Sequence, residues 1–206
     1  MELSMPELKL TPPYNLNTFI NDMDSDFWQQ RGLIEVNKGE IKAAMDYFKQ
    51  GLRINPGKHK LIYSLAVCYS RLKMYQSAIN WFSRGIDLHP RWVDGLCGIA
   101  ITYFNMLDFE RALKYISLAK DNNKGFQMKT TNEELTTEYI DFITATCLKM
   151  TMNHSDASKA YINLEVQFKK RLSTDLRNLL WGLILVPLSD DRKVIADHFT
   201  NVKEYL

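Results

Sequence analysis

Small and apolar residues recur every 34 positions along the first 126 residues of the chain. Alanine forms one such series at Ala44, Ala78 and Ala112. Four further series keep the same spacing. Their members are Gly32, Ala66 and Ala100; Phe48, Phe82 and Ile116; Gly51, Gly85 and Ala119; and Pro56 and Pro90. A fixed period of this length predicts stacked repeats, each of them a small supersecondary unit.

Each repeat is predicted to contain two helices joined by a turn. Small residues in both helices let antiparallel helix axes approach to about 8–10 Å. Gly39 lies in the predicted turn, where glycine tolerates positive φ, and Asp108 is placed to cap the second helix of the third repeat. Pro56 and Pro90 are expected to end the second helices, because proline lacks an amide hydrogen and restricts the preceding residue. The predicted fold class is therefore all-α, built from antiparallel helix pairs.

This register divides the chain into repeats and less regular flanks. The predicted segments are an extended N-terminal arm at 1–24, three repeats at 25–58, 59–92 and 93–126, a polar insertion at 127–137, a degenerate fourth helix pair at 138–172 and a C-terminal capping helix pair at 173–206. Prolines disfavour a helix in the arm, and Ser25 or Asp26 is expected to be the N-cap of the first repeat helix. The arm is expected to lie on the repeats or on a partner. The last pair is expected to cover the end of the solenoid, since an open end exposes core.

Composition and charge narrow the class of partner. The chain has 206 residues, of which 46% are hydrophobic, enough to build a core. Its 26 basic and 24 acidic residues nearly balance, so no nucleic-acid partner is predicted. The longest apolar run, Leu179–Val186, is shorter than the roughly 20 residues of a membrane span. No membrane insertion is therefore expected, and this run is either core of the cap or a second docking face.

The cysteines and the N-terminus favour a reducing, cytoplasmic setting. Cys68, Cys97 and Cys147 are far apart and form no CxxC pair, so we expect buried thiols rather than disulfides. The first residues lack the basic and apolar pattern of a secretory signal.

The residues of the repeats resemble a known family. The second repeat contains Ile62-x-x-Leu65-Ala66-x-x-Tyr69, then Ala78-x-x-x-Phe82-x-x-Gly85 and Pro90. This pattern is similar to the tetratricopeptide repeat (TPR) consensus. The first repeat departs from it at Arg31 and Glu35, and the third has Lys124 in place of the terminal proline. The resemblance implies a right-handed α-α superhelix, a TPR solenoid, whose concave groove binds a peptide or a helix.

The helix register places ten candidate partner-binding residues in that groove. They are Gln29, Leu33 and Asn37 in the first repeat, Tyr63, Val67 and Arg71 in the second, and Cys97, Ile101, Phe104 and Asn105 in the third. Packing against neighbouring helices or the arm accounts equally well for Leu33, Val67 and Ile101. The stronger candidates for contact with a partner are Tyr63, Arg71, Phe104 and Asn105.

One activity of the family is disfavoured by the groove residues. TPR domains that bind chaperones resemble one another in a set of Lys, Asn and Arg side chains that hold a C-terminal carboxylate. The matching positions here are Gln29, Leu33, Ser64, Asp94 and Gly98. None is of the required type, and Asp94 has the wrong charge for an acidic tail. A helix or an apolar peptide is the better predicted ligand.

The sequence contains no catalytic, cofactor-binding or metal-binding motif. The histidines His59, His89, His154 and His198 are scattered and form no HExxH motif. We therefore expect a non-enzymatic scaffold or adaptor, a subunit of a hetero-oligomeric complex, with a ciliary or cytoskeletal complex as the more specific hypothesis. Two alternatives stay open: a transient peptide-binding adaptor in folding or trafficking, and an enzyme or the regulatory subunit of one.

Overall fold

The chain folds into helices that form two compact units. The computed structural model describes residues 16–122 and 137–151, together with 155–157, 159, 160 and 162. Seven helices and no strand are found among these residues. The two units are Met1–Ser77 and Ala78–Leu206, and each is described by itself. The predicted all-α fold class is confirmed for the described part of the chain.

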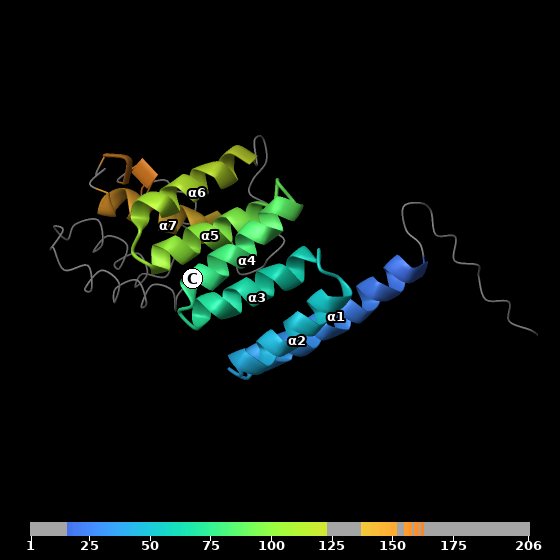
Figure 1. Cartoon of the computed structure of the whole chain (residues 1–206). Coiled ribbons are helices and arrows are strands. Elements are labelled where there is room, and N and C mark those ends of the chain that lie inside the picture. The colour runs from blue at the N-terminus through green and yellow to red at the C-terminus, as the bar shows by residue number, and fades with distance from the viewer. Residues whose placement is uncertain (1–15, 123–136, 152–154, 158, 161, 163–206) are drawn as a thin grey trace, which may run out of the picture. The chain divides into compact units, whose positions relative to one another are not determined.

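The first unit is a helical hairpin followed by a third helix (Figure 1). Its helices are α1 (Leu16–Asn37), α2 (Ile41–Ile54) and α3 (His59–Arg71), and α4 (Tyr75–Leu88) begins at its end. Gly32 of α1 faces Phe48 of α2, where an added Cβ would lie 2.2 Å from the ring. Likewise, a Cβ added to Gly51 of α2 would lie 2.7 Å from the side chain of Leu61 on α3. The small-residue series therefore marks the close approaches between helices, as predicted.

Aromatic and polar contacts fix the ends of the first repeat. The rings of Trp28 on α1 and Tyr47 on α2 stack with their centroids 5.9 Å apart. Lys58, in the loop before α3, forms an ion pair of 3.1 Å with Asp26 on α1. The stack joins the two helices of the hairpin, and the ion pair ties the loop after the hairpin back to α1.

The same turn joins the two helices in each of the three repeats. Gly39, Lys73 and Leu107 occupy equivalent positions, with φ of +82°, +58° and +62°. In each turn the following amide donates a hydrogen bond of 2.9 Å to a carbonyl five residues back. The pairs are Glu40 to Glu35, Met74 to Tyr69 and Asp108 to Tyr103. The predicted turn at Gly39 is confirmed, and residues with a Cβ adopt the same left-handed conformation in the other two repeats.

The second unit contains most of α4 and three further helices (Figure 1). These are α5 (Val93–Asn105), α6 (Phe109–Asn122) and α7 (Thr137–Met150). Gly98 of α5 faces the ring of Phe82 on α4, where an added Cβ would lie 2.4 Å away. Tyr103 of α5 stacks on Tyr115 of α6 with centroids 5.6 Å apart. The second unit thus also has a glycine that faces a phenylalanine ring and a stacked pair of aromatic rings between its helices.

The ends of the helices agree with the sequence predictions. Asp108 caps α6, because its Oδ1 accepts a hydrogen bond of 3.1 Å from the amide of Arg111. α2 and α4 each end two residues before a proline, Pro56 and Pro90 respectively. At the far end of α6, Lys120 forms an ion pair of 3.1 Å with Asp141 of α7.

The start of the first helix differs from its prediction. α1 begins at Leu16, so residues 16–24 are helical where an extended arm was expected. Ser25 is buried inside α1 and is not its N-cap. The three prolines that disfavour helix all precede residue 16, and apolar residues at helical spacing continue up to the first repeat.

The remaining predicted segments are described only in part. The predicted helix at 138–150 is confirmed by α7. Residues 155–157, 159, 160 and 162 are helical, as expected for the second helix of the fourth pair. The polar insertion before residue 137 and the capping pair at 173–206, with its Leu179–Val186 run, lie outside the described residues.

Candidate functional site

The predicted partner-binding residues lie along one side of the first helix of each repeat. Residues four apart share a helix face, so each helix carries one stripe of them. The stripes are Gln29, Leu33 and Asn37 on α1; Tyr63, Val67 and Arg71 on α3; and Cys97, Ile101 and Asn105 on α5. We call these three sets the inner stripes.

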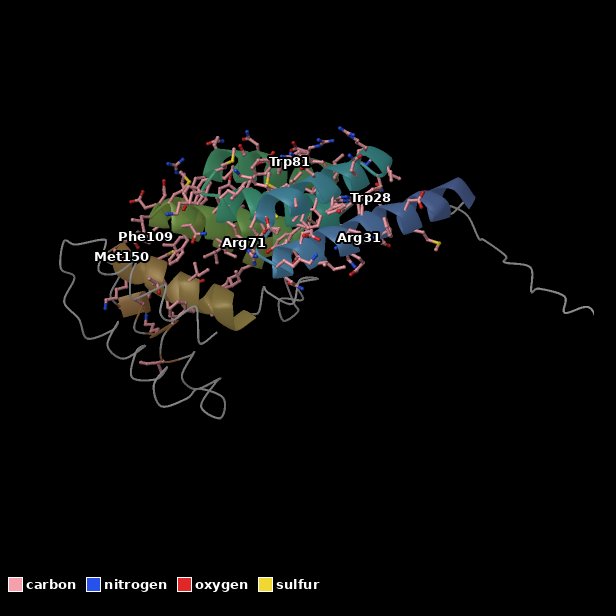
Figure 2. All side chains as sticks on the ribbon, turned by 90° about the horizontal axis from the view of Figure 1, so that it is seen from below. Trp28, Arg31, Arg71, Trp81, Phe109 and Met150 are labelled. Atoms are coloured by element: carbon pink, nitrogen blue, oxygen red, sulfur yellow. The ribbon has the colours of Figure 1, made fainter. Side chains whose placement is uncertain are left out.

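In the first unit, each inner stripe is accessible toward the C-terminal end of its helix, and Gln29 on α1 is also partly exposed. Asn37 and Arg71 are exposed, and Leu33 and Val67 are partly exposed. Arg71 is labelled in Figure 2 at the end of α3. Tyr63 retains only 8% of its surface, so this predicted contact residue mainly packs within the protein. At the C-terminal end of both helices, the accessible residues are therefore an aliphatic side chain and, one turn later, a polar one.

In the second unit, the inner stripe of α5 is covered along much of its length. Ile101 is partly exposed and Asn105 is exposed. Phe104 retains 8% of its surface and meets the ring of Phe109 edge-on, with centroids 5.9 Å apart. Phe109, labelled in Figure 2, begins α6. Phe104 is therefore a packing residue of the α5–α6 pair, and Ile101 with Asn105 forms the accessible part.

The prediction that Cys97 contacts a partner is wrong. Its side chain has no exposed surface. Burial raises the pKa of the Cys97 thiol to about 12, Asp94 adds to this rise, and Lys120 opposes it. Lys120 pairs with Asp141, so the next helix, α7, is held beside this region and α5 also packs on it. A covered, protonated thiol neither meets a partner nor acts as a nucleophile.

One exposed apolar surface was missed by the sequence reasoning. Met23, Phe27 and Ile34 on α1 retain 59%, 53% and 46% of their surfaces. Their spacing of four and seven residues was a usable signal, because it places them on one face of a helix. The expected extended arm up to residue 24 hid that signal, because it placed the start of the helix after Met23.

The described residues offer no evident site for metal chemistry or membrane insertion. No three His, Cys, Asp or Glu side chains among them gather closely enough to hold a metal ion. Within the same residues, none of the helices has both the length and the apolar character that crossing a membrane requires. All three cysteines are buried free thiols, as the sequence predicted.

The geometry defines the class of this protein as a helical-repeat protein, built from antiparallel helix pairs at a period of 34 residues. The family model described as "Tetratricopeptide repeat" matches residues 25–58 and 59–91. These two segments, about a third of the chain, are similar to the tetratricopeptide repeat family, and they agree with the first two predicted repeats to within one residue.

A curated relative shares part of the repeat region. The heat shock protein sti1 homolog of Schizosaccharomyces pombe is 28% identical over 97 residues, which cover 46% of this chain and 16% of the relative. The chain thus matches about a sixth of that protein's length.

Solved structures share the fold at low sequence identity. MamA from Desulfovibrio magneticus RS-1 has a TM-score of 0.61 at 14% identity, covering 88% of this chain and 94% of its own. The Sgt2 TPR domain from Aspergillus fumigatus has a TM-score of 0.52 at 16% identity, covering 64% and 81%. The first TPR of Spaghetti (RPAP3), bound to the HSP90 peptide SRMEEVD, has a TM-score of 0.50 at 16% identity, covering 65% and 94%. These likenesses place the chain in the α-α superhelix fold.

Proposed function

We propose that this protein is a non-enzymatic adaptor that binds a segment of a partner protein on its inner stripes. One observation carries the proposal: the same pair of accessible residues recurs in all three repeats. Partly exposed Leu33, Val67 and Ile101 are each followed four residues later by exposed Asn37, Arg71 and Asn105. On each helix, an apolar anchor with a polar neighbour one turn later suits contact with a helix or an extended peptide.

The proposal is tested by changing one repeat's pair and measuring partner capture. Val67→Asp with Arg71→Glu introduces charge at the anchor and reverses it at the polar position. Binding of proteins retained from an extract of the source organism should weaken by roughly tenfold or more, the usual cost of losing a contact hot spot. The circular dichroism spectrum should stay unchanged, because both side chains are at least partly exposed.

A matched control lies on the second helix of the third repeat. Leu118 and Lys114 of α6 are both exposed and four residues apart, so Leu118→Asp with Lys114→Glu makes the same chemical change elsewhere. This control should capture the same proteins as the unchanged chain. Equal loss in both variants, or in neither, would overturn the inner stripes as the binding surface.

A second candidate ligand is a chaperone tail. Support comes from the sti1 homolog and from the RPAP3 domain bound to the HSP90 peptide. The positions that would hold a terminal carboxylate argue against it. Asp94 is an acid that is 4% exposed, and Gly98 is closed off by Phe82. We therefore expect the peptide SRMEEVD to show no saturable binding in a fluorescence anisotropy titration, and micromolar binding would establish the second candidate instead.

The finer points of the proposal concern the assembly. We infer that the adaptor is a subunit of a hetero-oligomeric complex, with a cytoplasmic, ciliary or cytoskeletal setting as the working hypothesis. Gentle purification from the source organism tests this directly. Stoichiometric recovery with other chains is expected, and recovery as a lone chain would overturn it.

A further inference from the structure

The outward side of α1 carries a narrow stripe of exposed residues. Met23, Phe27 and Ile34 are exposed apolar side chains, and exposed Gln30 lies between them. We call Met23, Phe27, Gln30 and Ile34 the outer seam. Their spacing of four, three and four residues is the spacing by which one helix of a coiled coil meets another. In the sequence this spacing continues to Ile20 and Leu16, where the α1 backbone is still helical.

The outer seam faces away from the partner helix of the hairpin. The opposite side of α1 carries Trp28 and Gly32, which contact Tyr47 and Phe48 of α2. α1 has 22 residues against 14 in α2, and its first turns extend beyond the hairpin (Figure 1). A second helix therefore has room to approach along the seam.

The equivalent positions of the second repeat show which surface this face of a first helix contacts. Phe27 corresponds to Leu61 on α3, which is 0% exposed, and Ile34 corresponds to Cys68, which is 1% exposed. Leu61 packs on Gly51 of α2, a helix of the preceding repeat. This face of a first helix is thus the one that packs on the preceding repeat. On α1, large apolar residues occupy it and remain exposed.

The charged residues beside the outer seam would complement the same residues of a second copy. Asp24 and Arg31 lie seven residues apart on the same flank of the seam, and the Arg31 guanidinium sits 5.6 Å from the centroid of the Phe27 ring. Antiparallel pairing of two α1 helices brings like flanks together. Each Arg31 then faces Asp24 of the other copy, and each Met23 faces the other copy's Ile34.

A parallel pair is less well matched. It would bring opposite flanks together and set Arg31 beside the other copy's Asp26. Asp26 already forms an ion pair of 3.1 Å with Lys58 of its own chain. Parallel helices also place like ends of their dipoles side by side.

We propose that the outer seam is a self-association surface, on which α1 of a second copy of this chain packs antiparallel and related by a two-fold axis. This surface borders the inner stripe of α1, because Asn37 lies three residues after Ile34 and seven after Gln30 on the same helix. The interface is small, and its affinity belongs to the weak class of protein contacts, with a dissociation constant on the order of micromolar to millimolar.

The first test is the mass of the full chain as a function of concentration. Sedimentation equilibrium up to about 500 µM should show a monomer–dimer equilibrium. Phe27→Asp and Ile34→Asp should each raise the dissociation constant roughly tenfold or more. Leu118→Asp, an exposed leucine on α6, is the matched control and should not change it. A monomer at every concentration, or a dimer indifferent to both seam variants, overturns the proposal.

The second test determines the orientation of the two helices. Met23→Cys and Ile34→Cys are prepared separately, mixed and mildly oxidised, while the native thiols are buried. The antiparallel pair predicts a disulfide between the two different variants and little within either one. Efficient disulfide formation by Met23→Cys alone would indicate a parallel pair and overturn the proposed geometry.

Charge exchange provides an independent check of the same geometry. Arg31→Asp and Asp24→Lys should each weaken the dimer, because each places like charges across the pair. The double variant should recover the original dissociation constant. Failure of the double variant to recover, with its helicity intact, would overturn the proposed contact between these two residues.

Discussion

The outer seam of α1 and the equivalent face of α5 show how one repeat position takes two different roles. Where α1 has Phe27, Gln30 and Ile34, α5 has Gly95, Gly98 and Thr102. All three α1 residues are exposed and all three α5 residues are buried. A 34-residue register thus fixes which face of a first helix is available for packing. The place of the repeat along the chain decides whether that face is covered.

Residue size on the two faces follows from this difference. On α5, Gly98 admits the ring of Phe82, and the hydroxyl of Thr102 donates a hydrogen bond of 2.7 Å to the Gly98 carbonyl. A buried hydroxyl without such a partner would be costly. On α1, no such limit on size or polarity applies, and the exposed residues are large. Small residues on this face therefore accompany the covered side of α5, and large residues occupy the uncovered side of α1, whereas Leu61 on α3 is both large and covered.

The largest expected effect contrasts thiols at two equivalent positions, 29 and 97. Burial raises the pKa of Cys97 from 9.0 to about 12, so at pH 8 a much smaller fraction of it is thiolate than of an ordinary thiol. Gln29→Cys places a thiol at the same repeat position on α1, where the side chain is partly exposed. Native Gln29→Cys protein should show one fast-reacting thiol with an aromatic disulfide reagent, and the unchanged chain none.

The same pKa shift predicts how stability depends on pH. Between pH 9.0 and about 12 the folded state keeps the Cys97 proton that the unfolded state has lost. The free energy of unfolding should therefore fall as pH rises through this window. Cys97→Ala should show a weaker fall in chemical denaturation. An unchanged slope, or a fast thiol in the unchanged chain, would contradict the burial of Cys97.

The second prediction compares Leu61 and Phe27, which are equivalent residues on α3 and α1. Leu61 is 0% exposed and Phe27 is 53% exposed. Leu61→Ala should lower the free energy of unfolding by about 3 kcal/mol, because it removes buried surface and leaves a cavity. Phe27→Ala should change it by less than about 0.5 kcal/mol, the usual range for surface sites. Both are measured by urea denaturation at about 1 µM, a low concentration that disfavours self-association.

Similar losses in the two variants would contradict the contrast between the faces. A large loss for Phe27→Ala would mean that α1 is covered within its own chain. The outer seam would then be unavailable to a second copy.

The fold was largely predictable from the sequence, because its main determinants are local. Gly32 against Phe48, the turn at Gly39 and the cap at Asp108 each depend on a few neighbouring residues, and the 34-residue spacing repeats them. The predicted start of α1 was wrong, because prolines disfavour a helix only near their own positions. All three N-terminal prolines precede residue 16 and leave residues 16–24 free to be helical.

The candidate site was only partly predictable, because exposure depends on packing between helices. The register correctly grouped Cys97, Ile101 and Asn105 on one stripe of α5. The register does not show which of these residues are covered by helices that come later in the chain. Lys120 holds α7 beside this region through Asp141, a contact across 21 residues that no repeat consensus specifies. The exposure of Phe27 could not be predicted from the register either, because the equivalent residues of the other repeats are buried by neighbouring helices.

The smallest expected effect concerns the turns, where the first repeat is the better adapted. Gly39 adopts its φ of +82° without strain, whereas Lys73 and Leu107 hold φ of +58° and +62° with a Cβ present. A left-handed conformation costs a residue with a Cβ about 1 kcal/mol or more. Lys73→Gly should therefore raise the free energy of unfolding by up to about 1 kcal/mol, although the greater entropy of unfolded glycine offsets part of this gain. Gly39→Ala should lower it by a similar amount, since no atoms lie within 4 Å of the added Cβ and only backbone strain acts. Both changes are measured by urea denaturation. Destabilisation by Lys73→Gly would show that the lysine side chain contributes more to this turn than its backbone strain costs.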